Sequence, residues 1–243
     1  MFDKINRLLV QLSKLKFFVA LLFPTFLVSA ELIVHYKADG NALDSVGLND
    51  GIMINGVGFE TGQIDQAFDF NGANNFVQVA DNPVLDVDFP LTIAAWVRPE
   101  SNGAVDATTG ILWRGDSVSS PTGQSFAFLW YIDKVSFRLS DGSNLYGVCC
   151  APIPLNYFSH IAGTFDGLEI KLYLNGILVS TSSTVPASIY DSSSSLLIGS
   201  TAGSPPTRFY FDGQIDDVRI YDHVLSEVEV LLLADVIFEH GFE

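Results

Sequence analysis

The stretch Gly213–Leu232, GQIDDVRIYDHVLSEVEVLL, combines a strand pattern with the beginning of a helix. Its first half, Ile215–Tyr221, contains β-branched and aromatic residues that favour a strand. Ser226 is followed three residues later by Glu229, which fits a capping box at a helix N-terminus. The turns that follow share one apolar stripe, made by Val228, Leu231 and Leu232. The stretch therefore predicts a closing strand and then one short helix.

Upstream of this stretch, short apolar runs alternate with clusters of Gly, Asn, Asp, Ser and Pro, which is the spacing of an all-β sandwich. Nineteen Phe, eight Tyr and three Trp against two Met also favour packed sheets over helical bundles. We expect strands at Phe76–Val79, Leu91–Val97, Ser125–Ile132, Val135–Leu139, His160–Phe165, Ile170–Leu174 and Leu196–Ile198.

Periodicity and turn residues give these strands their orientation. In the run Val135–Leu139 the apolar side chains alternate with Ser136 and Arg138, so one face covers a core and the other points away. Hairpin turns are predicted where Gly follows a short polar residue, at Asp141-Gly142, Asp166-Gly167 and Asn175-Gly176.

The first thirty residues have the pattern of a signal peptide. Four basic residues precede the apolar run Phe17–Val28, and small residues end the segment at Ala30. The run has 12 residues and contains Pro24, whereas a membrane-spanning helix needs roughly 20. We expect cleavage after Ala30 and no membrane association of the mature chain. An exported protein is implied, bacterial and either secreted, periplasmic or on the cell surface.

The mature chain is strongly acidic. Without the leader it has 8 basic and 27 acidic residues, a net charge of −19. This charge repels phosphate backbones and anionic membranes, which excludes nucleic acid as a partner, and it attracts cations. The remaining 213 residues suffice for one core, so we expect a single domain over 31–234 and a short tail over 235–243.

Three blocks of the sequence resemble the laminin-G-like, concanavalin A-like lectin/glucanase family. They are the opening HYKADGNALDSVGLNDG with the motif AFDFNG at Ala67–Gly72, the middle FSHIAGTFDGLEIKLYLNG, and the closing GQIDDVRIY. The resemblance implies a two-sheet antiparallel jelly-roll-like sandwich. It also implies a binding or adhesion module on an exported protein rather than a particular reaction.

The loop after the first strand is rich in oxygen ligands. It places Asp39, Asn41, Asp44, Asn49 and Asp50 within twelve residues, and hard oxygen ligands favour calcium. The loop departs from the EF-hand template, because the position that requires Gly is Asp44.

The resemblance implies a calcium ion between this loop and the last strand, where the acidic residues are Asp216 and Asp217. The alternative is that Asp39 and Asp44 only make turns with their own backbone, and that Asp217 pairs with Arg219. The sequence leaves both readings open.

A sugar-binding surface needs a flat aromatic ring with polar groups beside it. Trp113, Tyr146 and Tyr210 lie in segments that read as loops or strand ends, with Arg114 adjacent to the first. We expect these four residues as candidate ligand contacts, although each of the aromatic side chains also suits packing beneath a loop.

Cys149 and Cys150 are adjacent, so they cannot join distant strands. Three states are compatible with an exported chain: a vicinal disulfide, an intermolecular bridge, or one buried and one exposed thiol.

The sequence contains no recognisable catalytic set. The Glu-x-Asp-x-x-Glu strand motif of glycosidases with this fold is absent, and the four His have no metal-ligand spacing. We therefore expect a non-catalytic module that binds a glycan or another extracellular surface. A protein–protein adhesion or structural module is the alternative, and a divergent glycoside hydrolase is the third possibility.

Overall fold

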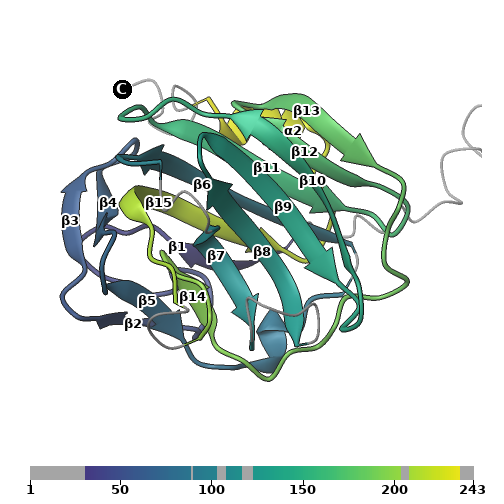
Figure 1. Cartoon of the computed structure of the whole chain (residues 1–243), viewed down its shortest axis with the longest axis horizontal. Coiled ribbons are helices and arrows are strands. Elements are labelled where there is room, and N and C mark those ends of the chain that lie inside the picture. Colours follow the sequence, from purple (N-terminus) through teal and green to yellow (C-terminus); the bar gives the residue numbers. More distant parts are fainter. Residues whose placement is uncertain (1–30, 89, 103–107, 117–122, 204–207, 236–243) are drawn as a thin grey trace, which may run out of the picture.

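A computed structural model describes residues 31–88, 90–102, 108–116, 123–203 and 208–235. These residues form two antiparallel sheets, one short α-helix and one 3₁₀ turn. In Figure 1 strands β7, β8 and β9 lie in front of β6, β11 and β15, so the sheets stack as two layers. The predicted sandwich is confirmed. The expected signal peptide, 1–30, and all but the first residue of the expected tail, 235–243, lie outside the described residues.

The first sheet has eight strands in the order β13-β12-β11-β6-β15-β4-β3, with β1 paired to β15. The first and last strands of the domain are therefore neighbours, with His35 opposite Arg219. The strands are β1 (Leu32–Tyr36), β3 (Gly58–Thr61), β4 (Gln66–Asn71), β6 (Leu91–Pro99), β11 (Ser159–Phe165), β12 (Ile170–Leu174), β13 (Ile177–Ser182) and β15 (Asp212–Tyr221).

The second sheet has seven strands in the order β10-β9-β8-β7-β14-β5-β2. They are β2 (Gly51–Ile54), β5 (Phe76–Val79), β7 (Thr109–Gly115), β8 (Gln124–Tyr131), β9 (Lys134–Ser140), β10 (Leu145–Pro152) and β14 (Leu196–Ile198), and the 3₁₀ turn η1 (Pro83–Leu85) follows β5. Consecutive strands β7 to β10 pair as hairpins, so this part of the sheet forms from near neighbours in the sequence.

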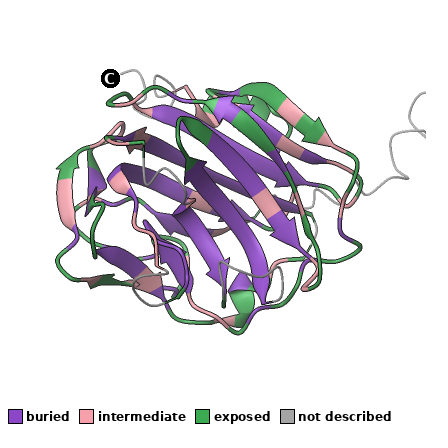
Figure 2. Cartoon of the chain, in the orientation of Figure 1, coloured by how far each residue is buried: buried purple, intermediate pink, exposed green. Residues whose placement is uncertain are grey.

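The main core lies between the two sheets and is dominated by aromatic side chains. Phe126, Phe128 and Trp130 alternate along β8 and are at most 1% exposed. Phe137 on β9 packs against Phe128, with ring centroids 4.9 Å apart. Figure 2 shows the central strands of both sheets buried along most of their length. Each such side chain stabilises the fold by about 2–3 kcal/mol relative to an exposed one.

The helix α2 (Glu227–Leu233) begins with the predicted capping box, in which Ser226 and Glu229 bond reciprocally. Val230 is fully buried in a cluster with Ala94, Ala162 and Tyr173, so the helix packs on the outer face of the eight-stranded sheet. No helix in the described part of the chain is long and apolar enough to cross a membrane.

Candidate functional site

Two regions of the fold bring polar side chains together at a place where a ligand could bind. The first is where the loop after β1 meets β15. Asp216 on β15 is fully buried, and its Oδ2 accepts a hydrogen bond from the Ile64 backbone N–H at 2.9 Å. Its other oxygen, Oδ1, has no hydrogen-bond partner. Burial, together with the nearby charges of Asp217 and Asp39, raises the pKa of Asp216 to about 8.

The turn between β3 and β4 joins the first loop to this buried carboxyl. Asp39 Oδ1 accepts a hydrogen bond from the Gln66 backbone N–H at 3.1 Å, which ties the loop to the turn. A Cβ atom on Gly62 would lie 2.6 Å from Asp216 Oδ2 and 2.7 Å from the Gln66 carbonyl oxygen, so the turn passes too close for any larger residue. The loop after β1, the turn 62–66 and strand β15 are therefore packed against one another here.

Asp44 lies in the same loop, and its carboxylate stabilises the backbone of that loop. Its carboxylate accepts hydrogen bonds from the backbone N–H groups of His35, Val46 and Asn49 and from the Asn49 side chain, at 3.0–3.3 Å. Burial opposes ionisation of Asp44, but these donors outweigh it and keep the pKa of the carboxyl below its usual value. This is the turn-forming role that the sequence left open for Asp44.

The Asp217 carboxylate also pairs with neighbouring side chains. It contacts His35 Nε2 at 2.5 Å and Arg219 Nε at 2.9 Å. Burial raises the pKa of Asp217, while the His35 hydrogen bond and the Arg219 charge lower it, and the net shift is downward. Of the four acidic residues predicted as metal ligands, Asp39 and Asp217 line one pocket together, while Asp216 is fully buried beside the turn 62–66. Among the described residues no three His, Cys, Asp or Glu side chains form a metal-binding group, so a cation there would need backbone oxygens as well.

The structure places the expected sugar contact Trp113 inside β7 rather than in a loop. Its side chain is 3% exposed and packs on the outer face of the second sheet with Ala127, Leu129 and Leu197. Its indole N–H donates to the Gly115 carbonyl at 2.9 Å. The expectation of an exposed ring was wrong, because glycines at both ends of β7 resemble loop boundaries.

Arg114 is fully buried and ion-paired. Its guanidinium contacts Asp81 Oδ1 at 2.9 Å, pairs with Asp86, and donates to the Ser192 carbonyl. The expectation that Arg114 lies beside a bound sugar was therefore also wrong. The guanidinium instead connects the segment around η1 to the loop that precedes β14.

Tyr146 and Tyr210, the other two expected sugar contacts, are half-buried. Tyr146 on β10 donates its hydroxyl proton to Asp141 Oδ2 at 2.9 Å, and this bond raises the pKa of the phenol. Tyr210 packs near Phe76, with ring centroids 6.2 Å apart. Both rings are partly packed against the hydrophobic clusters, and Tyr146 also lines part of the second region.

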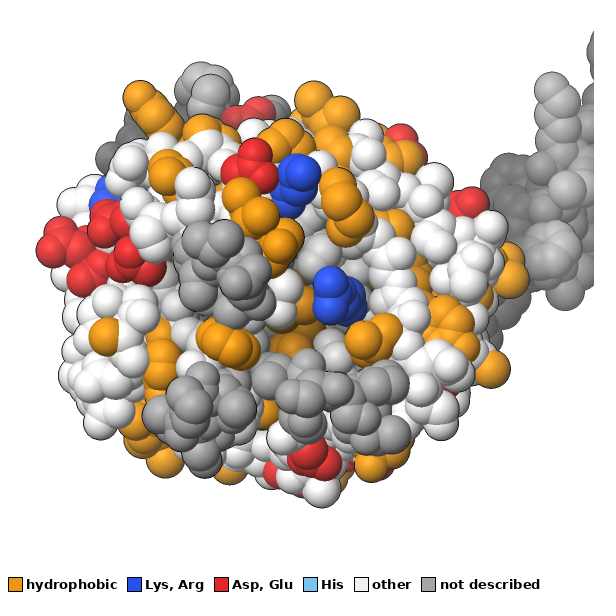
Figure 3. All heavy atoms as spheres, in the orientation of Figure 1, with side chains coloured by type: hydrophobic (Ala, Val, Ile, Leu, Met, Phe, Trp, Pro, Cys, Tyr) orange, Lys and Arg blue, Asp and Glu red, His pale blue; other side chains and the backbone are white. Residues whose placement is uncertain are grey.

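The second region is a hollow on the outer face of β8, β9 and β10. One part of it has a volume of about 230 Å³. A second part, of about 360 Å³, adjoins it at Arg138 and Cys149, which line both. We call the first part the β9 hollow; its lining residues are Thr108, Tyr131, Lys134, Val135, Ser136, Arg138, Cys149 and Cys150. In Figure 3 basic side chains stand beside hydrophobic ones in the middle of this face.

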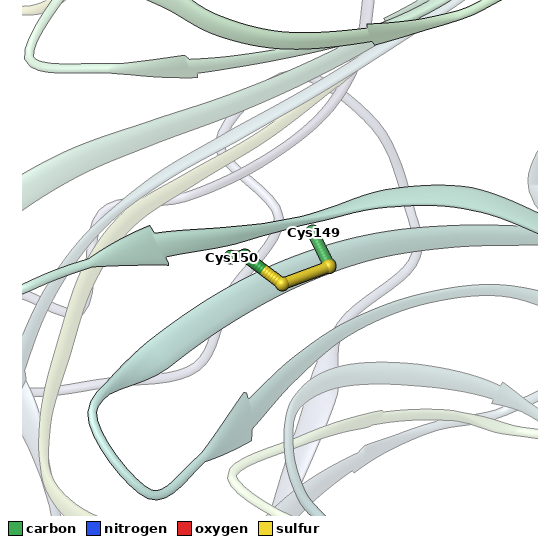
Figure 4. The surroundings of a disulfide bond; sticks show 2 residues. All are labelled: Cys149 and Cys150. Carbon is green, nitrogen blue, oxygen red and sulfur yellow. A yellow bond between two sulfur atoms is a disulfide. The ribbon is translucent and has the colours of Figure 1, made fainter.

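Cys149 and Cys150 are joined by a disulfide that faces the β9 hollow. Adjacent residues of a regular strand point to opposite faces. Here β10 contains a bulge between Cys149 and Ala151, and Cys150 has a φ of 81°. Figure 4 shows the two sulfur atoms bonded directly across neighbouring positions of the chain. The bulge therefore brings both cysteine side chains, which are exposed, to one side of the strand.

The residues that line the hollow were not predicted as a group. The alternation along Val135–Leu139 correctly placed Ser136 and Arg138 on the face away from the core. The register between β9 and β10 could not be predicted from the sequence. It places Ser136 opposite Cys149 and Arg138 opposite Gly147.

Comparisons with known proteins agree with this fold. A family profile described as the concanavalin A-like lectin/glucanases superfamily matches residues 71–231. A search of curated proteins found no match. Among solved structures, domain 4 of AbnA, a GH43 extracellular arabinanase from Geobacillus stearothermophilus solved in complex with arabinotriose, is 22% identical with a TM-score of 0.68. That match covers 85% of this chain and 99% of that one.

Two toxin domains are similar as well. The binding domain of Paraclostridial Mosquitocidal Protein 1 is 18% identical with a TM-score of 0.67, over 85% of this chain and 52% of that chain. The botulinum neurotoxin serotype G binding domain is 18% identical with a TM-score of 0.64, over 87% and 52%. The chain thus spans about half the length of these two domains. With the family profile matching most of its sequence, the chain belongs to the concanavalin A-like lectin/glucanase superfamily.

Proposed function

We propose that this protein is an exported, non-catalytic module that binds carbohydrate in the β9 hollow. The observation that supports this is the exposed disulfide ring beside the partly exposed ring of Tyr131, with the Ser136 hydroxyl and the Arg138 guanidinium in the same lining. Apolar surface of this kind covers the C–H face of a sugar, and the polar groups bind its hydroxyls. The arabinotriose complex of the similar arabinanase domain supports a sugar ligand.

The lining also supports a binding role rather than hydrolysis. Glycoside hydrolysis generally requires two carboxyl groups on either side of the scissile bond. The lining of the β9 hollow contains no Asp or Glu. Export is supported by the leader pattern in residues 1–30. Sequencing the N-terminus of the purified protein tests export, and a mature chain that retains residues 1–30 would contradict it.

Binding is tested on a glycan array with the purified protein and with the double variant C149S/C150S. Loss of the disulfide ring is expected to abolish the strongest glycan responses. Tyr157→Ala is a matched control, because Tyr157 is 70% exposed and lies outside the lining of the hollow. Absence of any glycan response in the unmodified protein would refute carbohydrate binding, and hydrolysis of a polysaccharide panel would refute the non-catalytic role.

A calcium ion that stabilises the loops is the second part of the proposal. The Oδ1 atom of Asp216 is a buried carboxylate oxygen without the hydrogen bond that such groups normally have, which supports a role as a cation ligand. Asp39, Asp216 and backbone carbonyls of the turn 62–66 would hold the ion, which would supply positive charge between the two carboxylates. A chelator is expected to lower the melting temperature, and Asp39→Ala to abolish that effect.

A protein–protein adhesion module is the alternative function. It is favoured by the apolar surface at the free edge of the first sheet, where strand β13 ends the strand order. The exposed side chains there are Ile177, Leu178 and Val179, with Leu231 and Leu232 on the nearby helix. A silent glycan array together with an extracellular protein captured by the module, and lost on Val179→Asp, would favour this alternative.

A further inference from the structure

The β9 hollow concentrates unpaired positive charge in a protein that has little of it. Residues 31–243 contain eight basic residues, and four of these have an acidic partner among the described residues: Arg98, Arg114, Lys171 and Arg219. Lys134 and Arg138 form no ion pair with any described residue, and both line the β9 hollow, where no acidic residue does. The hollow is therefore a cationic site on an acidic molecule.

The environment of Arg138 makes this charge available to a ligand. The residue is half-buried on β9, and desolvation lowers the pKa of its guanidinium. A partly desolvated charge has a free-energy cost unless a counter-ion pairs with it. A guanidinium is also the side chain best shaped to bind a carboxylate or sulfate through two parallel hydrogen bonds.

The neighbouring strand is shaped to hold the Arg138 side chain in place. Gly147 is paired with Arg138 across β9 and β10. A Cβ atom on Gly147 would lie 2.4 Å from the Phe137 carbonyl oxygen and 3.2 Å from Arg138 Cγ. Glycine at this position therefore lets the aliphatic stem of Arg138 lie close over the backbone of β10. Arg138 and Cys149 line both parts of the hollow, so the Arg138 side chain and the disulfide belong to one surface.

We propose that the β9 hollow binds a saccharide that bears an acidic group, with its apolar face on the Cys149–Cys150 disulfide and its anionic group paired with Arg138 and Lys134. This inference rests on the proposed function and specifies the class of sugar. A carboxylate of a uronic acid and a sulfate ester share the chemistry that Arg138 would bind, so the experiment includes both. Long-range repulsion by the acidic chain would weaken the encounter, but short-range pairing in the hollow would still select acidic sugars over neutral ones.

The test measures binding of three trisaccharide probes by titration calorimetry: a galacturonic acid trimer, its neutral methyl ester, and a sulfated galactose trimer. At least one acidic probe is expected to bind about tenfold or more tightly than the methyl ester. Arg138→Gln is expected to remove that preference while leaving the melting temperature near that of the unmodified protein. Lys171→Gln is the matched control, because it removes the same charge from the other sheet and should leave the preference intact.

A second variant tests whether the position of the Arg138 side chain matters as well as its charge. Gly147→Ala keeps Arg138, but its Cβ would clash with the Phe137 carbonyl oxygen and crowd the Arg138 stem, so β10 must shift away from β9 and the preference for the acidic probe should fall as it does in Arg138→Gln. Equal affinity for acidic and neutral probes, or an acidic preference unchanged in Arg138→Gln, would overturn the inference while leaving carbohydrate binding intact. If none of the probes binds but an array detects other neutral glycans, the acidic-sugar inference also fails. If no glycan binds at all, the proposed function fails as well.

Discussion

Asp216→Asn is predicted to change how stability depends on pH in the absence of calcium. Asp216 has a folded-state pKa of about 8 against an ordinary value of 3.8, so between these values the folded state binds a proton that the unfolded state has released. The free energy of unfolding therefore falls as pH rises, by about 1.4 kcal/mol per pH unit from this group alone. Between pH 4 and 7 the loss is about 4 kcal/mol, and above pH 8 it no longer grows.

Asparagine does not ionise, so the variant should lack this part of the slope. At pH 7 and in a chelator, Asp216→Asn is expected to be more stable than the unmodified protein by up to about 4 kcal/mol, which corresponds to a melting temperature about 10 °C higher. Calcium should remove most of this difference, because it favours the ionised carboxylate. At a concentration one hundred times its dissociation constant it adds about 3 kcal/mol to the unmodified protein and nothing to the variant.

The assay is urea unfolding followed by tryptophan fluorescence at pH 5, 6, 7 and 8, first with a chelator and then with calcium. Asp133→Asn, which changes an exposed carboxylate on the turn between β8 and β9, is the matched control and should keep the slope of the unmodified protein. The reasoning fails if Asp216→Asn has the same slope between pH 5 and 8 as the unmodified protein. It also fails if calcium stabilises the variant as strongly as the unmodified protein.

Three further predictions use the same unfolding assay. Asp44→Ala should cost about 2 kcal/mol, because four donors lose their acceptor, yet it should retain the full calcium response that Asp39→Ala loses; a lost response in Asp44→Ala would place the ion elsewhere. Arg114→Met should cost about 3 kcal/mol by leaving two carboxylates without their buried partner, and a neutral effect would refute a structural role for the ion pair. Ser226→Ala should cost about 1 kcal/mol through loss of the helix cap, and an unchanged midpoint would show that packing alone holds the helix.

Much of the fold was predictable because its signals are local. The alternation in Val135–Leu139 and the apolar run at Leu91–Val97 both predicted strands that the structure contains, and the capping box at Ser226 predicted the start of α2. The turn Asn175-Gly176 has positive φ at both residues, as a two-residue hairpin requires. Each of these features depends on residues close in sequence.

Strands β7 and β10 are among those that the sequence did not predict, because their patterns are atypical. In β7 every residue is buried, so no alternation marks it, and glycines at both ends resemble loop boundaries. In β10 the bulge at Cys150 shifts the register, so the period of two breaks in the middle of the strand. The expected roles of Trp113 and Tyr146 were affected by these two errors, since both residues lie on strands rather than in loops.

Each of the two candidate sites contains a β-bulge, which explains why side-chain periodicity could not locate them. β15 has a bulge between Asp216 and Arg219, where Asp217 has a φ of 50°, and β10 has one at Cys150, where φ is 81°. An extra residue in a strand changes which way the neighbouring side chains point. In β15 adjacent carboxylates acquire separate partners, and in β10 adjacent sulfurs reach the same side. A strict period of two cannot describe either segment, because each contains an inserted residue, so the pattern fails at the positions where these polar and sulfur-containing side chains lie.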